Sequence, residues 1–136
     1  FCLPSAGRYG LGAVGWTMLI SCLGVQWSLL TLPFFSNLYA YGLDLGSWTK
    51  ATLSMSQLLQ ANFAVAAFLI SFGALIGKIS PLQIALLVLI ESVCYAANDE
   101  LLLSGYLNIS DCGGTIPIHC FCAYFGLAVS YALGVP

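Results

Sequence analysis

Charged residues are rare in this 136-residue sequence, and the gaps between them are long. No Asp, Glu, Lys or Arg occurs in residues 9–43, 51–77 or 112–136, which are runs of 35, 27 and 25 residues. A helix needs roughly 20 apolar residues to cross the hydrocarbon core of a membrane. Each run can therefore hold one spanning helix. The stretch from Pro81 to Asn98, interrupted only by Glu91, can hold a fourth.

The composition excludes several classes of protein. Charged residues make up 6% of the sequence and hydrophobic residues 60%, whereas an ordinary soluble domain carries roughly 25% charged residues. Such a chain cannot cover the surface of a soluble fold, and it lacks the charge that is typical of disordered segments. Three cations and a net charge of -2 make no phosphate-binding face, so we expect no nucleic-acid partner. The sequence indicates a multi-pass membrane protein in contact with the lipid bilayer.

Helix is the expected backbone structure of the four spans. In lipid, each spanning segment must satisfy its own backbone polar groups, and the apolar runs lack the alternation of a membrane β-barrel. We therefore expect an all-α membrane protein with transmembrane helices at approximately residues 9–35, 55–77, 81–98 and 112–134.

Glycine and proline indicate where these helices end and pack. Pro33 is expected to help close the first helix, and Pro81 suits the first turn of the third. Gly73 and Gly77 form a small-xxx-small pair, which favours close packing of helices. Glycines in the first helix, Gly24 among them, favour close packing in the same way.

The cations predict an orientation. Four helices joined by three loops put Arg8 and Lys78 on one side of the membrane and Lys50 on the other. The excess of cations places the Arg8 side in the cytoplasm. Asn108 begins an Asn-x-Ser glycosylation sequon on the predicted outer side, so it is a candidate for glycosylation.

Three ionisable residues within or beside the expected spans are functional candidates. His119, the only histidine, lies eight residues after Asp111, which is about 12 Å along a helix. There a neutral imidazole is favoured over the charged form, and it can meet a ligand or bond to a neighbouring helix. Asp111 can also be a simple helix N-cap. Glu91 must be protonated, be paired with another group, or face a water-filled crevice. It can take part in a proton path or in a structural hydrogen bond.

The six cysteines do not indicate a metal site or a cofactor. Cys22, Cys94, Cys120 and Cys122 lie in the expected spans, where cysteine behaves as a small apolar residue. Adjacent residues on one helical turn point apart, so His119 and its neighbouring cysteines cannot surround one ion. No Ser-His-Asp set, phosphate-binding loop or nucleotide-binding glycine pattern occurs, and we do not expect an enzyme.

One segment of the sequence resembles a known family. The segment Asp111-Cys-Gly-Gly-Thr-Ile-Pro-Ile-His119-Cys-Phe-Cys-Ala-Tyr-Phe-Gly-Leu-Ala-Val129 is similar to the Rhesus (Rh) glycoprotein branch of the ammonium transporter family. Three further stretches resemble the same branch in the same order: Arg8-Tyr9-Gly10, Leu23-Gly-Val-Gln-Trp27, and Asn62-Phe63 leading through Ser71-Phe72-Gly73-Ala74 to Gly77-Lys-Ile-Ser-Pro81. The resemblance covers essentially the whole sequence.

The resemblance implies a fold, an assembly and an activity. Members of the family are trimers with one conduction path through each protomer, built as an inverted repeat. The four expected helices then correspond to the second through fifth core helices, in the first half of that repeat. We expect an ammonium/ammonia channel or transporter that forms a homotrimer in the plasma membrane. Because the sequence starts with Phe1 rather than methionine and ends on an apolar run, we expect it to be a fragment of a longer chain.

The same resemblance assigns roles to individual residues. His119 matches the first of two pore histidines, Asp111 an acid at the outer start of that helix, and Phe63 the outer gate. Glu100 matches an acidic position in the outer vestibule, although Asp99 can hold this position instead. The implied mechanism passes neutral ammonia through a hydrophobic pore lined by histidine.

Two departures from the family pattern and two alternative functions stay open. Asn62 stands where relatives often carry Asp, and Cys122 stands where Gly is usual, which calls close packing beside the last helix into question. The chain can instead belong to a non-conducting Rh-type structural subunit of a membrane complex, or to a membrane enzyme that uses Glu91 or His119. Retention of His119 and Asp111 favours transport.

Overall fold

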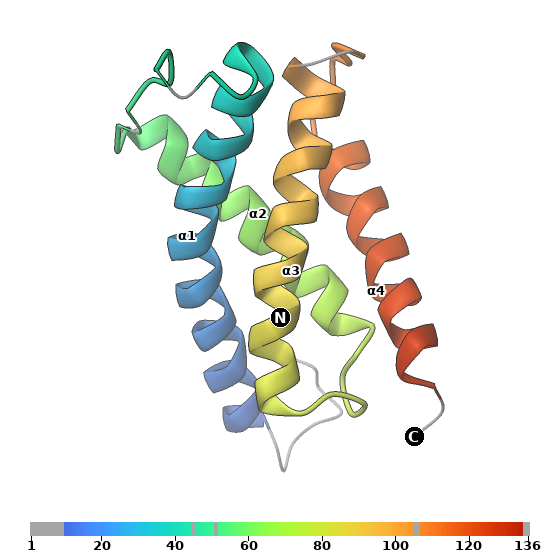
Figure 1. Cartoon of the computed structure of the whole chain (residues 1–136). Coiled ribbons are helices and arrows are strands. Elements are labelled where there is room, and N and C mark those ends of the chain that lie inside the picture. Colours follow the sequence, from blue (N-terminus) through green and yellow to red (C-terminus); the bar gives the residue numbers. More distant parts are fainter. Residues whose placement is uncertain (1–9, 45, 51, 105–106, 135–136) are drawn as a thin grey trace.

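Four helices form an antiparallel bundle in which α2 runs obliquely behind α1 and α3 (Figure 1). The computed structural model describes residues 10–44, 46–50, 52–104 and 107–134, and these residues contain no strand. The elements are α1 (Gly10–Tyr41), α2 (Met55–Gly73), α3 (Pro81–Asp99), the π-helical segments η1 (Glu100–Ser104) and η2 (Thr115–Cys120), and α4 (Phe121–Leu133). The stretches long and apolar enough to cross a membrane are Val14–Tyr41, Met55–Gly73, Pro81–Leu103 and Thr115–Leu133. The predicted all-α membrane fold with four transmembrane helices is confirmed.

The first helix is longer than the sequence analysis predicts. Its 32 residues span about 48 Å at 1.5 Å per residue. It continues past Pro33, so the expectation that Pro33 helps to close it is wrong. A proline removes one backbone hydrogen bond, but spanning helices tolerate this where the surrounding structure compensates. The helix stops instead at Gly42, which has a φ of 63° and donates its N–H to the Leu38 carbonyl oxygen at 2.9 Å, a left-handed helix end that suits glycine.

Serine–glutamine pairs begin α2 and α3. At the start of α2, the Gln57 N–H donates to Ser54 Oγ at 3.2 Å, and the Ser54 N–H donates to Gln57 Oε1 at 3.3 Å. This reciprocal pair is a capping box. Ser80 and Gln83 form the same box before α3, and Pro81 occupies the first turn of that helix as predicted. The caps satisfy N–H groups that the start of a helix otherwise leaves free.

The Gly73–Gly77 pair does not pack two helices together. α2 ends at Gly73, and Gly77 lies in the following turn with a φ of 84°. Within the part of the chain that the structure describes, a Cβ atom at either position would meet no packed neighbour within 4 Å, so the predicted close contact at this pair is wrong. Gly77 instead allows the chain to reverse into α3, because glycine adopts a positive φ without steric conflict.

Close helix contacts occur at Gly24 and Gly126. A Cβ atom at Gly24 would lie 2.9 Å from Cδ2 of Phe68, so α1 approaches α2 closely at this point. A Cβ atom at Gly126 would lie 3.0 Å from the Cα of Ser71, so α4 approaches the backbone of α2. Cys122, one turn earlier on α4, is buried. The cysteine that replaces the usual glycine is therefore accommodated, and Gly126 provides the close contact.

The hydrophobic core joins α1, α2 and α3 to the helix that follows them. It includes Ile20 from α1, Phe68 from α2, Tyr95 from α3 and Ile118 from η2. The rings of Phe68 and Tyr95 meet edge to face with centroids 6.3 Å apart, an arrangement that aromatic pairs favour. These contacts hold η2, which carries His119, against the rest of the bundle.

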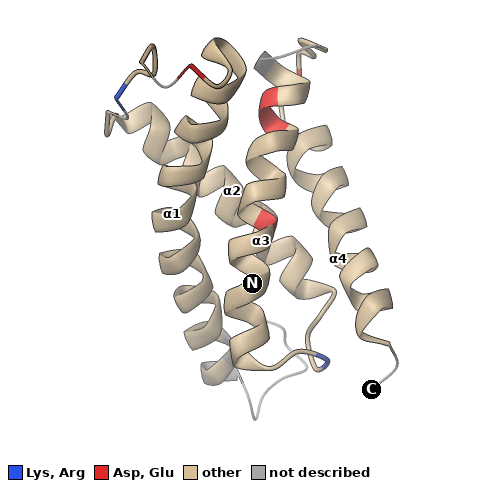
Figure 2. Ribbon diagram, viewed as in Figure 1, with Lys and Arg blue, Asp and Glu red and all other residues tan. Residues whose placement is uncertain are grey.

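Most of the charged residues that the structure describes lie at the two ends of the bundle (Figure 2). We call the end with the α2–α3 turn and Lys78 the inner end, and the end with the α1–α2 loop and the α3–α4 connection the outer end. Lys50 and the Asp99–Glu100 pair belong to the outer end. This separation of Lys78 from Lys50 agrees with the predicted order of the loops. Arg8, on which the assignment of the inner end to the cytoplasm also depends, lies outside the described residues, and that orientation stays a prediction.

Candidate functional site

His119 lies on η2, at the outer end of the fourth span. Gly114 turns the chain with a φ of 65°, and the helix begins at Thr115. His119 is therefore one turn, about 6 Å, from the start of the helix. The expected depth of about 12 Å along the helix is wrong, because residues 111–114 form a bend instead of a helical turn.

The imidazole of His119 is exposed on the surface of the bundle. Its Nδ1 lies 3.2 Å from the carbonyl oxygen of Gly114. A carbonyl oxygen only accepts hydrogen bonds, so this contact is a hydrogen bond when Nδ1 carries the proton. In the neutral ring, Nε2 then keeps its lone pair and can accept a hydrogen bond from a ligand.

Asp111 holds the turn that leads to the histidine. Its Oδ2 accepts the N–H of Ile116 at 2.8 Å, and its Oδ1 accepts the N–H of Gly113 at 3.1 Å. These hydrogen bonds, first the one from Ile116, hold the pKa of the Asp111 carboxyl below its usual value, because they favour the charged form. The Asp111 side chain therefore accepts an N–H at the start of the helix, but the prediction that Asp111 is the N-cap residue is wrong, because Gly114 occupies that position.

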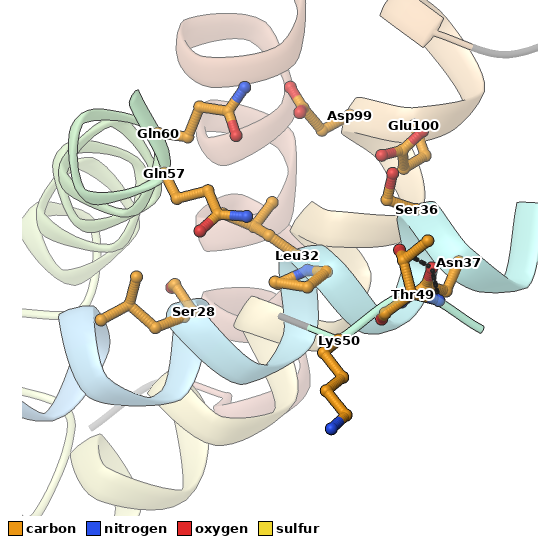
Figure 3. Close-up of a pocket in the computed structure, with 12 residues that line it drawn as sticks. Ser28, Leu32, Ser36, Asn37, Thr49, Lys50, Gln57, Gln60, Asp99 and Glu100 are labelled. Atoms are coloured by element: carbon orange, nitrogen blue, oxygen red, sulfur yellow. Dashed lines mark hydrogen bonds between the residues drawn. The ribbon is translucent and has the colours of Figure 1, made fainter. Parts of the chain in front are cut away.

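Asp99 and Glu100 line one pocket at the outer end, between α1, α2 and α3 (Figure 3). The pocket has a volume of about 240 Å³. Figure 3 shows the amine of Lys50 directed away from the two acidic side chains. Polar residues of α1 and α2 also line this pocket: Ser28, Ser36, Asn37, Gln57 and Gln60. Carboxylates in a polar pocket create a negative potential that attracts small cations.

The gate candidate Phe63 lies elsewhere on the bundle. It belongs to α2 and is 48% exposed, and neither it nor Asp111 nor His119 lines the outer pocket. The structure brings Asp99 together with Glu100, and it joins Asp111 to the turn before His119. It does not gather all five around the outer pocket. The transport roles assigned to them stay predictions.

A buried polar link joins three helices, and the sequence predicts a polar role for only one of its members, Glu91. Ser71 Oγ on α2 forms a hydrogen bond with Oε1 of Glu91 on α3 and another, of 3.0 Å, with the carbonyl oxygen of Cys122 on α4. All three residues are 0% exposed. Glu91 thus has the hydrogen bond that was one of its two predicted roles. The sequence does not predict a special role for Ser71, because small hydroxyl residues are common wherever spanning helices meet.

The remaining predictions concern glycosylation and metal binding. Asn108 is exposed in the α3–α4 connection with a φ of 43°, a conformation that asparagine tolerates better than most residues. Its glycosylation stays a prediction. Among the described residues, no group of three His, Cys, Asp or Glu side chains is placed to hold a metal ion.

Comparisons with known proteins follow the resemblance closely. Residues 3–136 match the Ammonium Transporter Family. The sequence is 38% identical over 136 residues to ammonium transporter Rh type C-like 2 of Danio rerio, a match that covers 100% of this chain and 26% of the relative. It is 40% identical over 129 residues to ammonium transporter Rh type B of Bos taurus, with 95% and 26% covered. It is 35% identical over 136 residues to ammonium transporter Rh type C of Xenopus tropicalis, with 100% and 27% covered.

These matches extend over nearly the whole chain but only part of the relatives. The chain spans about a quarter of the length of the three curated proteins, all of which are named as transporters. Their Rh names confirm the resemblance to the Rh branch, and the four apolar helices agree with a multi-pass membrane protein. This chain belongs to the ammonium transporter family.

Proposed function

We propose that this chain forms part of an ammonium/ammonia channel or transporter, and that the full-length protein is a homotrimer in the plasma membrane. The observation that carries the proposal is the match of residues 3–136 to the Ammonium Transporter Family. The names of the Rh-type relatives support the same substrate. Transport also suits a chain in which charged residues are few and, among the described residues, lie mainly at the ends of the apolar spans.

The species that crosses the apolar part of the path is neutral ammonia. Moving a bare ion of this size into a low-dielectric interior costs about 20 kcal/mol in the idealised limit. Moving a small neutral polar group costs roughly 2–7 kcal/mol. The span Thr115–Leu133 contains no Asp, Glu, Lys or Arg that could offset the charge of ammonium. Ammonia therefore has the lower barrier, and its proton does not travel with it through this region.

His119 supplies the polar contact that compensates ammonia for the loss of water. With Nδ1–H donated to the Gly114 carbonyl oxygen, Nε2 accepts an N–H of the passing molecule. A protonated imidazole would offer no acceptor and would repel ammonium, so the neutral ring is the active form. Exposure of the ring on the bundle surface leaves it free to face a path completed by the remainder of the protein.

The outer residues act before this step. Asp99 or Glu100 raises the local concentration of ammonium at the outer end, and Phe63 excludes water and hydrated ions, because an apolar constriction dewets. Asp111 acts by holding the backbone turn before His119. Both of its carboxylate oxygens already accept backbone N–H groups, so it positions the turn that presents His119 and does not need to touch the cation.

Substitution of His119 by alanine tests the proposal. We expect about a fivefold to tenfold loss of ammonia or methylammonium flux in vesicles that contain the full-length protein, which corresponds to the loss of one hydrogen bond. Cys120→Ala is the matched control, because Cys120 is the exposed neighbour on the same turn. Unchanged flux in His119→Ala would remove the histidine from the mechanism.

The wild-type protein provides the second half of the experiment. Measurable flux together with a trimer in native mass spectrometry is the expected result. A folded, trimeric wild-type protein without flux would contradict the proposal and favour a structural Rh-type subunit.

A further inference from the structure

The link of Ser71, Glu91 and Cys122 has hydrogen bonds that only one protonation state satisfies. A serine hydroxyl carries a single hydrogen, yet Ser71 Oγ contacts both Glu91 Oε1 and, at 3.0 Å, the Cys122 carbonyl oxygen. If Glu91 were ionised, both partners could only accept, and one of the two contacts would lack a proton. A protonated Glu91 removes this conflict. Its O–H donates to Ser71 Oγ, and the Ser71 hydrogen is donated to the Cys122 carbonyl oxygen.

The surroundings of Glu91 favour the same state. Its side chain is 0% exposed, and Oε2 has no hydrogen-bond partner within the described part of the chain. Lys50 and Lys78, the cations among the described residues, lie in loops at opposite ends of the bundle (Figure 2). A buried carboxylate without a counter-charge is strongly unfavourable. The neutral acid leaves only a carbonyl-type oxygen unpaired, which is a much smaller penalty.

The link lies at the contact between α2 and the helix that carries the histidine. η2 passes into α4 without a break, and Cys122 follows His119 by three residues, slightly less than one turn. One turn further along, Gly126 packs against the backbone of Ser71. A bond to the Cys122 carbonyl oxygen therefore fixes the rotation and height of the helix close to the imidazole.

We propose that Glu91 is an uncharged hydrogen-bond donor that acts through Ser71 to hold the His119 helix in position for transport. Glu91 does not touch the transported molecule, and no proton leaves it during transport, so it is a positioning residue. The positioning role rests on the proposed transport function. The protonation of Glu91 does not, and it can be measured separately.

Infrared spectroscopy of the purified full-length protein tests the protonation. A protonated carboxylic acid has a C=O stretching band that is well separated from the bands of a carboxylate. At neutral pH, the difference spectrum of wild type minus Glu91→Gln is expected to contain the acid band. A carboxylate band in its place would overturn the proposal, whether or not the protein transports ammonia.

Flux measurements in vesicles test the positioning role. Glu91→Gln keeps a side-chain donor and is expected to retain close to wild-type flux, whereas Glu91→Leu fills the space without a donor and should lower flux about fivefold. Ser71→Ala should match Glu91→Leu. Ser92→Ala is the control, because Ser92 is also buried but bonds to the Leu89 carbonyl oxygen of its own helix at 2.9 Å.

The outcomes separate the two proposals. Loss of flux in a folded Glu91→Gln protein would mean that Glu91 must exchange a proton, and unchanged flux in Ser71→Ala would mean that the link does not position the helix. Either result overturns the inference. If Glu91→Leu does not fold, Ser71→Ala carries the comparison. A wild-type protein without flux would overturn the proposed function, and the infrared result would still decide the state of Glu91.

Discussion

Two acidic residues on the same helix have opposite environments. Glu91 and Asp99 both belong to α3 and are eight residues apart. Glu91 is buried and bonded to Ser71, whereas Asp99 lines a pocket at the outer end beside Glu100. In the middle of a span, a polar group must find its partners within the protein, because lipid offers none. At the end of the span, water and solutes can be the partners of a polar group. We therefore expect the middle of α3 to fix the positions of the helices and its outer end to be available to ions.

A lysine in place of Glu91 is expected to give the largest difference in stability between the middle of α3 and its outer end. Glu91→Lys removes the carboxyl group that is bonded to Ser71 and buries an unpaired cation between three helices, which should cost roughly 3–5 kcal/mol. Thermal unfolding of the full-length protein in detergent is expected to show a large fall in Tm, or no folded protein. Glu100→Lys is the control and should change Tm little. Similar losses in the two variants would break the comparison, because the outer end would then be packed as tightly as the middle.

A smaller loss is expected when a methyl group is added where α4 meets α2. Gly126→Ala places a Cβ atom 3.0 Å from the Cα of Ser71, and overpacking of this kind costs about 1–3 kcal/mol. Gly73→Ala is the matched control, since its Cβ atom would meet no packed neighbour within 4 Å. The same unfolding measurement should separate the two variants. Equal stability would mean that the helices can move apart without penalty.

Acid affects the outer turn at Asp111 by a different route. Hydrogen bonds from Ile116 and Gly113 lower the pKa of Asp111. Its ionised form therefore stabilises the turn fully above the unfolded pKa of about 3.9, and the stabilisation is lost as the pH falls through the lower folded pKa. Hydrogen exchange in residues 111–119, corrected for intrinsic rates, should show constant protection between about pH 7 and pH 5 and weaker protection in stronger acid.

Asp111→Ala provides the reference for that experiment. It should show faster exchange in the same segment at every pH, because the acceptor is gone. A wild-type protein that loses protection already between about pH 7 and pH 5 would require a raised pKa and would contradict the hydrogen bonds seen here.

The smallest effect is expected at the outer pocket. Asp99→Asn or Glu100→Gln should weaken the apparent affinity for ammonium by about twofold to tenfold at low salt, through the loss of local negative potential, and the difference should shrink at high salt. Concentration-dependent flux at two ionic strengths measures this. The variant with the larger, salt-sensitive loss identifies the vestibule acid. No change in either variant would mean that the pocket does not supply the path.

The spans could be predicted from the sequence because the cost of charge in lipid acts directly on composition. The ends of the helices could not be predicted as well. Pro33 is a helix breaker in water, but α1 passes through it and ends at Tyr41, just before Gly42. Gly73 and Gly77 have the spacing of a packing pair, but α2 ends at Gly73 and Gly77 lies in the turn that follows. Spacing alone does not reveal where the helical register stops.

The candidate site shows the same division. Glu91 and His119 could be identified because an ionisable group in an apolar run is visible in the sequence. Ser71 could not, since it lies twenty residues from Glu91 and its importance depends on the rotation of α2 against α3. That Asp111 accepts an N–H at the start of the helix could be predicted from its position before the helix, but the bend at Gly114 could not, and this bend shortened the expected depth of His119.

The π-helical winding of η2 affects the direction in which His119 points. Its hydrogen bonds reach back five residues, as from the His119 N–H to the Gly114 carbonyl oxygen at 3.2 Å, so the segment accommodates one residue more than an α-helical ring would. Each residue on an α-helix is displaced by about 100° from the next (3.6 per turn). Deleting one residue of η2 would rotate the imidazole to another direction, while Gly126 would stay packed against α2. The direction of the histidine therefore depends both on the winding of η2 and on the docking of α4 against α2.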